Sequence, residues 1–197
     1  LLLSALQSHP SGPVRYSAVM APADAAGVSS TLRVSMALPG DVSVFRAELI
    51  MPRAIPMGYG QVAYDQFVTV TAARSRSGSP AVLTRGEGPR WSVSSVNASD
   101  PLAGLDYEVD LSAMERSVLS GGDSSRARDG YVSLLGYSVF AYVEGLEDRA
   151  VDLAIAPPPN HPDWPVFSTL APKAPARAGP MKAGAIAVPL FTLFGPD

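Results

Sequence analysis

The feature that most constrains this chain is an alternation of apolar and polar side chains with a period of two, interrupted about every ten residues by proline and glycine. In Val42–Met51, for example, apolar residues from Phe45 onward alternate with Arg46 and Glu48, and the run stops at Pro52. Short runs with this spacing predict half-buried strands and are typical of a β-sandwich or barrel. The predicted strands are Val14–Met20, Thr31–Leu38, Val42–Met51, Gln61–Ala72, Ala81–Thr84, Trp91–Val96, Leu105–Leu111, Tyr131–Val143, Ala150–Ala156 and Gly184–Leu193.

One short helix is predicted directly after the strand Leu105–Leu111. Ser112 is its expected N-cap, Glu115 lies three residues further on as a capping-box partner, and Gly121-Gly122 ends it. A second helix is a weaker prediction over Leu1–Gln7. The sequence therefore predicts an all-β fold with one or two short helices.

The C-terminal part of the chain has a different character. Ten of the 19 prolines lie in the final 41 residues, and proline cannot donate to a sheet ladder. Trp164 and Phe167 nevertheless indicate a packed segment, because a solvated linker would not carry them. We expect a β-domain over residues 1–156 and a proline-rich segment over 157–197 that packs on the same or a neighbouring subunit, with a last strand near 184–193.

Composition excludes several classes of protein. The chain has no cysteine, which excludes disulfides, thiolate metal sites and cysteine nucleophiles. Its formal net charge of −3 provides no bulk attraction for nucleic acid. No apolar run approaches the roughly 20 residues of a membrane span, and Leu1–Leu3 is too short for a signal peptide. We expect no membrane partner.

Residues that could support catalysis are few. The two histidines, His9 and His161, each precede a proline in a predicted loop, and a histidine needs a positioned partner to act as a base. No Gly-x-Ser-x-Gly, HExxH or EF-hand pattern occurs. The glycine pairs in residues 58–60 and 86–88 lack the following glycine, lysine and helix of a phosphate-binding loop. We therefore predict no enzyme, no catalytic residue and no cofactor.

Three acidic residues share one face of a predicted strand. Asp106, Glu108 and Asp110 alternate with Tyr107 and Val109. Carboxylates aligned in this way repel one another, so they require water, arginines or a hard cation such as Ca²⁺. Two interpretations remain open: a solvated or arginine-paired face, and an ion site buried between subunits.

Four arginines flank the loops that follow the strand ending at Ala72. Arg74, Arg76, Arg85 and Arg90 are candidates for contacts with nucleic-acid phosphate, and ordinary solvation of loops is the alternative, because no basic stripe with interleaved aromatic residues occurs. A separate three-residue pattern, starting at Asn97, matches a glycosylation acceptor but is common by chance.

The stretch SVFRAELIMPRAIPMGYGQVAYDQF, residues 43–67, has a strand ending in an apolar-Met-Pro step, a proline loop, and then Gly-Gln-Val-Ala-Tyr-Asp. This order resembles the middle of jelly-roll coat proteins from small icosahedral positive-strand RNA viruses. Asn97-Ala-Ser-Asp-Pro-Leu102, a strand, a short helix at Ala113–Leu119 and the strand Tyr131–Val143 look like the later half of tymovirus-type coat proteins. The resemblance covers roughly residues 12–156.

The resemblance implies an antiparallel eight-stranded jelly-roll sandwich. It implies a coat protein that self-assembles into an icosahedral shell around an RNA genome, found in the virion and, during assembly, in the host cytoplasm. The implied partners are many copies of the chain itself and genomic RNA, the latter through an arm outside this chain.

Two other functions remain open from the residues. An extracellular β-sandwich module that binds carbohydrate or protein would gather aromatic side chains such as Trp91 and Trp164 on one exposed face. A hydrolase or isomerase on a cupin-like barrel would need clustered histidines and a carboxylate to hold a metal ion, and the two histidines are far apart in sequence.

Overall fold

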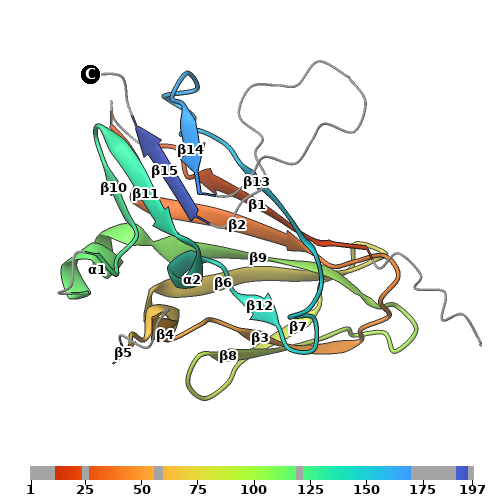
Figure 1. The fold of residues 1–197 in the computed structure, drawn as a ribbon. Coiled ribbons are helices and arrows are strands. Elements are labelled where there is room, and N and C mark those ends of the chain that lie inside the picture. Colours follow the sequence, from red (N-terminus) through yellow and green to blue (C-terminus); the bar gives the residue numbers. More distant parts are fainter. Residues whose placement is uncertain (1–11, 24–26, 56–59, 119–121, 170–189, 195–197) are drawn as a thin grey trace, which may run out of the picture.

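The structure, a computed structural model, describes residues 12–23, 27–55, 60–118, 122–169 and 190–194. Strands dominate these residues, with two short helices and a 3₁₀ turn (Figure 1). In chain order the elements are β1 (Val14–Met20), β2 (Thr31–Ala37), β3 (Arg46–Ile50), β4 (Ala54–Ile55), β5 (Gly60–Gln61), η2 (Tyr64–Phe67), β6 (Val68–Ser75), β7 (Val82–Arg85), β8 (Arg90–Ser94), β9 (Leu102–Asp110), α1 (Leu111–Ser117), β10 (Arg126–Arg128), β11 (Tyr131–Leu135), α2 (Gly136–Val139), β12 (Tyr142–Val143), β13 (Val151–Ile155), β14 (Val166–Ser168) and β15 (Leu190–Phe194).

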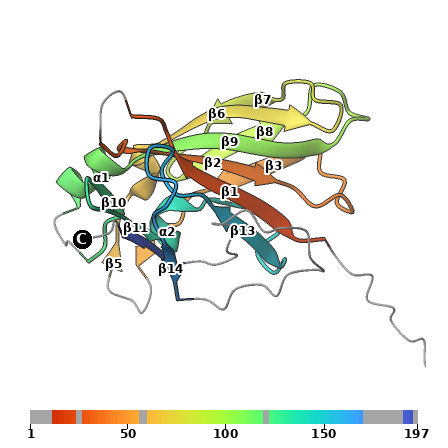
Figure 2. The same cartoon turned by 90° about the horizontal axis from the view of Figure 1, so that it is seen from above.

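Three sheets and a small ribbon make up the fold (Figure 2). Sheet I has the strand order β13-β1-β2-β9-β6, sheet II has β12-β3-β8-β7, and sheet III has β10-β11-β15-β14; β4 and β5 form the ribbon. Every pairing in these sheets is antiparallel except that of β1 with β13, which is parallel.

One face of sheet I carries the core. On β1 and β2 every second residue is buried, so Tyr16, Val34 and their neighbours lie inside while Arg15 and Arg33 lie outside. The buried side chains of sheet I join those of sheets II and III in a single hydrophobic cluster. Sheets II and III therefore together form the second layer of a sandwich, and the other face of sheet I is exposed.

The mainly β fold with few short helices is confirmed. The eight-stranded jelly roll is not confirmed, because the edge strand β13 runs parallel to β1 and the second layer is divided between two sheets. The alternation of side chains reports which face of a strand is buried, but it does not specify the order in which strands pair.

Several predicted strand limits were wrong for local reasons. The strand predicted over Val42–Met51 begins at Arg46, and the range Gln61–Ala72 contains the end of β5 and the 3₁₀ turn η2 before β6 begins at Val68. The run Tyr131–Val143 is divided into β11, α2 and β12. Its apolar pattern continues through the break because both flanking strands and the helical turn face the same core.

The short helix after the acidic strand is confirmed, but its predicted cap was wrong. The helix α1 starts at Leu111, and the carboxylate of Asp110 accepts the Ala113 N–H at 2.8 Å. Glu115 pairs with Arg128 instead of closing a capping box. No helix in the described part of the chain is long and apolar enough to span a membrane. The helix predicted over Leu1–Gln7 lies outside the described residues.

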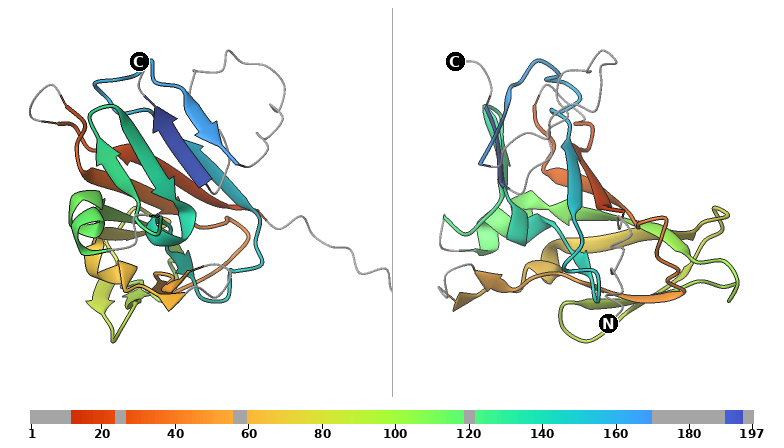
Figure 3. Two further views of the ribbon diagram at one scale, coloured as in Figure 1. Left: turned by 60° about the vertical axis from the view of Figure 1, so that its left-hand side comes forward. Right: turned by 45° about the vertical axis from the view of Figure 1, so that its right-hand side comes forward.

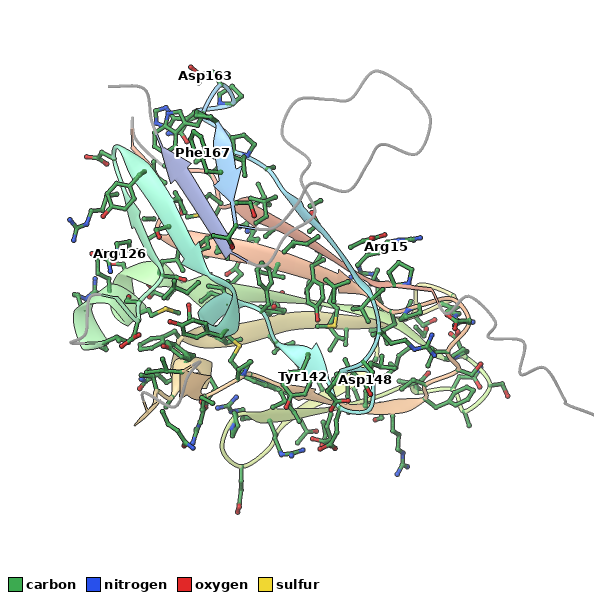
Figure 4. All side chains as sticks on the ribbon, viewed as in Figure 1. Arg15, Arg126, Tyr142, Asp148, Asp163 and Phe167 are labelled. Atoms are coloured by element: carbon green, nitrogen blue, oxygen red, sulfur yellow. The ribbon has the colours of Figure 1, made fainter. Side chains whose placement is uncertain are left out.

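Parts of the proline-rich segment belong to sheet III. Of the strand predicted near 184–193, residues 184–189 lie outside the described residues, and residues 190–193 fall in β15, which pairs with β11 and with β14 (Figure 3). Trp164, just before β14, is buried, whereas Phe167 on β14 is largely exposed, near Asp163 at the top of Figure 4. The boundary between residues 156 and 157 stays a prediction.

Candidate functional site

Asp65 is the one charged side chain that is buried among the residues that the structure describes, with 4% of its surface exposed. Its two carboxylate oxygens accept three hydrogen bonds from arginines. Arg53 donates from Nε to Oδ1 at 2.7 Å and from Nη2 to Oδ2 at 3.0 Å, and Arg85 donates from Nη2 to Oδ2 at 2.7 Å. Trp91 completes the group, because the Arg85 guanidinium carbon lies 3.9 Å from the centre of its ring. We call Arg53, Asp65, Arg85 and Trp91 the Asp65 cluster.

Four separate elements bring the Asp65 cluster together. Arg53 lies between β3 and β4, Asp65 in η2, Arg85 at the end of β7, and Trp91 opposite Arg85 on β8. The cluster therefore links sheet II to the segment that enters sheet I at β6. It lies at the end of the sandwich that also carries α1 and the β4–β5 ribbon (Figures 1 and 2).

The turn between β7 and β8 also belongs to this end of the molecule. Gly88 in that turn has a φ of +61°, which favours glycine, and a Cβ atom built there would lie 4.0 Å from Arg53 Nη2. The turn therefore borders the Arg53 guanidinium closely. Glu87, the neighbouring residue, forms no ion pair with either arginine among the pairs of the described chain.

The electrostatics of the cluster are set by one carboxylate and two guanidiniums. Burial raises the pKa of Asp65, but the hydrogen bonds from Arg53 and Arg85 lower it more, and the net pKa lies below the usual value of an aspartate. The hydrogen bond to Asp65 raises the pKa of Arg53 in turn. Both arginines remain partly in contact with solvent, with 36% and 43% of their side chains exposed. The cluster therefore presents one uncompensated positive charge at the surface.

A tyrosine pair supports the same end of the sandwich. Tyr64, which precedes Asp65, is buried and donates its hydroxyl proton to the carbonyl oxygen of Asp123 at 2.7 Å. Its ring meets that of Tyr137 edge to face, with centres 5.8 Å apart. These contacts link η2 to α2 and to the loop before β10. Asp65 is therefore held in place by the contacts of its neighbour Tyr64 and by its own hydrogen bonds with the two arginines.

The structure places the acidic residues predicted from the sequence on the exposed face of sheet I. Asp106 accepts hydrogen bonds from Ser35 at 2.6 Å and from Arg74, and Glu108 pairs with Arg33 at 2.9 Å. Asp110 caps α1. In the described ranges no group of three or more histidine, cysteine, aspartate or glutamate side chains could hold a metal ion. The geometry is that of an arginine-paired face.

The four arginines proposed for phosphate contacts have four different sets of partners. Arg74 pairs with Asp106, Arg76 donates to the carbonyl oxygen of Val42 at 2.7 Å, and Arg90 pairs with Glu144 at 3.1 Å. Arg85 belongs to the Asp65 cluster. They therefore do not form one shared site, and phosphate contact by any of them stays a prediction.

The remaining candidates have local structural roles in the described chain. The His161 ring stacks on Trp164 with centres 4.4 Å apart, and His9 lies outside the described residues. The side-chain Oδ1 of Asn97 accepts the Ser99 N–H at 2.9 Å, which closes a turn. Sequence reasoning missed Asp65 as a site residue. The local sequence showed only a lone carboxylate between the aromatic residues Tyr64 and Phe67, and its two arginine partners are 12 and 20 residues away.

Comparisons with known proteins point to peptidases. A family model described as the peptidase M61 N-terminal domain matches residues 25–185. An aminopeptidase N family protein from Idiomarina loihiensis aligns with a TM-score of 0.70 at 21% identity, covering 92% of this chain and 29% of that one. At this identity the likeness shows the fold alone.

A second solved structure has a weaker likeness. The M1 zinc metallopeptidase from Deinococcus radiodurans aligns with a TM-score of 0.44 at 12% identity, covering 94% of this chain and 38% of that chain, and a score this low carries no argument. No curated protein matches the chain. The chain spans 29% of the length of the Idiomarina protein.

These findings overturn the coat-protein prediction. The icosahedral shell, the assembly of many copies, the genomic RNA partner and the location in virion and host cytoplasm were wrong, because the family model that matches residues 25–185 is that of a peptidase N-terminal domain. An extracellular carbohydrate- or protein-binding module is not supported either. The resemblance depended on the order and spacing of elements, and many unrelated β-sandwiches share that order without sharing a function.

Proposed function

The chain belongs to the family of peptidase M61 N-terminal domains, and we propose that it is a non-catalytic domain that docks on the catalytic unit of a peptidase. The observation that carries the proposal is the family match over residues 25–185. The catalytic unit can belong to the same polypeptide or to a separate subunit.

The extent of the structural alignment supports this proposal, because the alignment leaves most of the Idiomarina aminopeptidase N family protein outside the match. We place the catalytic chemistry of such a protein in that remaining part, and we assign the β-sandwich a role in positioning it or in shaping access to it. The prediction from the sequence that the chain itself is not an enzyme is retained as part of this proposal.

The end of the sandwich that carries η2, the β4–β5 ribbon and the Asp65 cluster is the docking surface that we propose. Interfaces between domains of one protein are more polar than obligate subunit interfaces. Arg53 and Arg85 are half-exposed there, yet they are held in place by Asp65. A surface that combines charge with a fixed geometry suits such an interface.

The proposal is tested with two separately purified proteins, the 197-residue chain and the catalytic unit of the M61-type peptidase of the same organism. We expect the chain alone to leave aminoacyl arylamides intact with or without added Zn²⁺. We expect calorimetry to detect binding between the two proteins, and addition of the chain to change kcat or KM of the catalytic unit. Hydrolysis by the chain alone, or a lack of binding with both proteins folded, would overturn the proposal.

A further inference from the structure

We propose that Arg53 and Arg85 form a carboxylate-binding site that receives an aspartate or glutamate side chain of the catalytic unit. This inference rests on the proposed function and deepens it by naming the contact through which the domain docks. It is carried by the hydrogen bonds, the charge and the rigidity of the Asp65 cluster.

The hydrogen-bond capacity of the two arginines is mostly unused. Each guanidinium has five N–H groups in a fixed fork. Asp65 takes two N–H groups of Arg53 and one of Arg85. In the described chain these two arginines make no ion pair with any other carboxylate. Several donors on each side chain therefore remain available to a second acceptor.

The charge balance points to the same ligand. Two guanidiniums share one carboxylate, so the second positive charge is not compensated within the cluster. Positive charges held beside the same carboxylate repel each other, and a further anion that contacts both would relieve this repulsion. Asp65 itself is buried, so that anion must approach from the exposed edges of the arginines.

The arginines are also held in place before any ligand arrives. Asp65 holds Arg53 with two parallel hydrogen bonds, and Arg85 is held between Asp65 and the buried ring of Trp91. A stacked guanidinium loses little further freedom on binding. Such preorganisation lowers the entropy cost of binding.

A carboxylate is the anion that fits best. The planar fork of arginine matches a carboxylate with two parallel hydrogen bonds. Nucleic acid is disfavoured as the ligand, because the chain carries a formal net charge of −3 and gains no bulk attraction for it. An interface between domains supplies carboxylates at fixed positions, and one of them can meet both arginines.

The main experiment measures the Kd between the chain and the catalytic unit for matched variants. We expect the double variant Arg53→Gln, Arg85→Gln to bind about tenfold or more weakly, since truncating one side of a hydrogen-bonded charge pair at an interface is costly. Arg33→Gln is the matched control. That arginine also pairs with one carboxylate and is half-exposed, but it lies on the outer face of sheet I.

Loss of both arginines leaves Asp65 as a buried charge without a partner, which could unfold the domain. The triple variant Arg53→Gln, Asp65→Asn, Arg85→Gln removes that charge and should give the same tenfold loss of affinity with a native circular dichroism spectrum. Equal Kd values for the wild type and a folded double or triple variant would overturn the inference while leaving the proposed function intact.

A second measurement does not depend on the catalytic unit. Sodium acetate, titrated into the chain against sodium chloride at equal ionic strength, should shift the NMR signals of the Arg53 and Arg85 Nε–H groups and leave that of Arg33 unchanged. No shift would contradict the carboxylate site. If acetate shifts these signals but the variants bind the catalytic unit normally, the carboxylate comes from another source, such as a peptide C-terminus, and the proposed docking contact is wrong.

Discussion

The hydroxyl group of Tyr107 on β9 donates to the carbonyl oxygen of Val139 in α2 at 3.0 Å. The same hydroxyl oxygen accepts the Ala141 N–H at 3.1 Å, and the Tyr16 hydroxyl donates to the carbonyl oxygen of Ala141 at 2.9 Å. Two tyrosines of sheet I thus form hydrogen bonds with the backbone groups of the segment where α2 ends and the chain continues into β12. Burial raises the pKa of both tyrosines, so both hydroxyls keep their protons across the ordinary pH range.

Tyr107→Phe should lower the free energy of unfolding by about 1–3 kcal/mol, because it leaves a buried N–H and a buried carbonyl without their partner. Urea denaturation followed by circular dichroism measures this loss. Tyr142→Phe on β12 is the control, with an expected change within about 0.5 kcal/mol, since that side chain is only partly buried. Equal losses in the two variants would show that the Tyr107 hydroxyl contributes nothing specific.

Asp65→Asn should destabilise the fold by about 1–3 kcal/mol at pH 7, because hydrogen bonds from two arginines to a buried carboxylate become weaker ones to an amide. The pKa of Asp65 is lowered in the folded state. Its ionised form therefore stabilises the protein above the pKa of the unfolded chain, near 4 for an aspartate. This contribution disappears as the pH falls through the lower pKa of the folded state.

The measurement is the difference in unfolding free energy between wild type and Asp65→Asn from pH 7 down to pH 3. We expect the difference to shrink below about pH 4. Taking the difference removes the contribution of Asp41 and Asp100, whose pKa values are also lowered by hydrogen bonds in the fold. A difference that stays constant to pH 3 would contradict the ion-pair account of Asp65.

Gly104→Ala should destabilise the centre of sheet I by about 1–3 kcal/mol through overpacking. A Cβ atom at this position would lie 2.3 Å from the carbonyl oxygen of Met36 on the adjacent strand β2, so one of the two strands must move. Gly40→Ala is the matched control, because a Cβ atom there has nothing within 4 Å. Thermal denaturation should give a lower Tm for Gly104→Ala alone.

Asp110→Ala should cost about 1 kcal/mol by removing the N-cap of α1. Ser112→Ala should cost much less, since the Ser112 hydroxyl only accepts a hydrogen bond from the exposed Arg116. Chemical denaturation of the two variants decides which residue caps the helix. A larger loss for Ser112→Ala would contradict the capping geometry.

The alternation of apolar and polar residues within each segment predicted much of the fold. The burial of β1 and β2 follows their alternating residues, and α1 begins where the acidic strand ends. These features depend on neighbours within a few residues, which the sequence contains directly. The break at α2 was not predicted, because the apolar pattern continues through it, and because the hydrogen bond from the Tyr107 hydroxyl to Val139 joins residues that are 32 positions apart.

The sequence by itself determined which segments extend, which faces they bury and where the short helix lies, because side-chain periodicity is local. Only the tertiary structure decided that β13 pairs in parallel with β1 and that Arg53, Asp65, Arg85 and Trp91 meet. Contacts of this kind join segments that are distant along the chain. These contacts depend on how the layers pack against each other, and the alternation of residues within one segment does not indicate that packing.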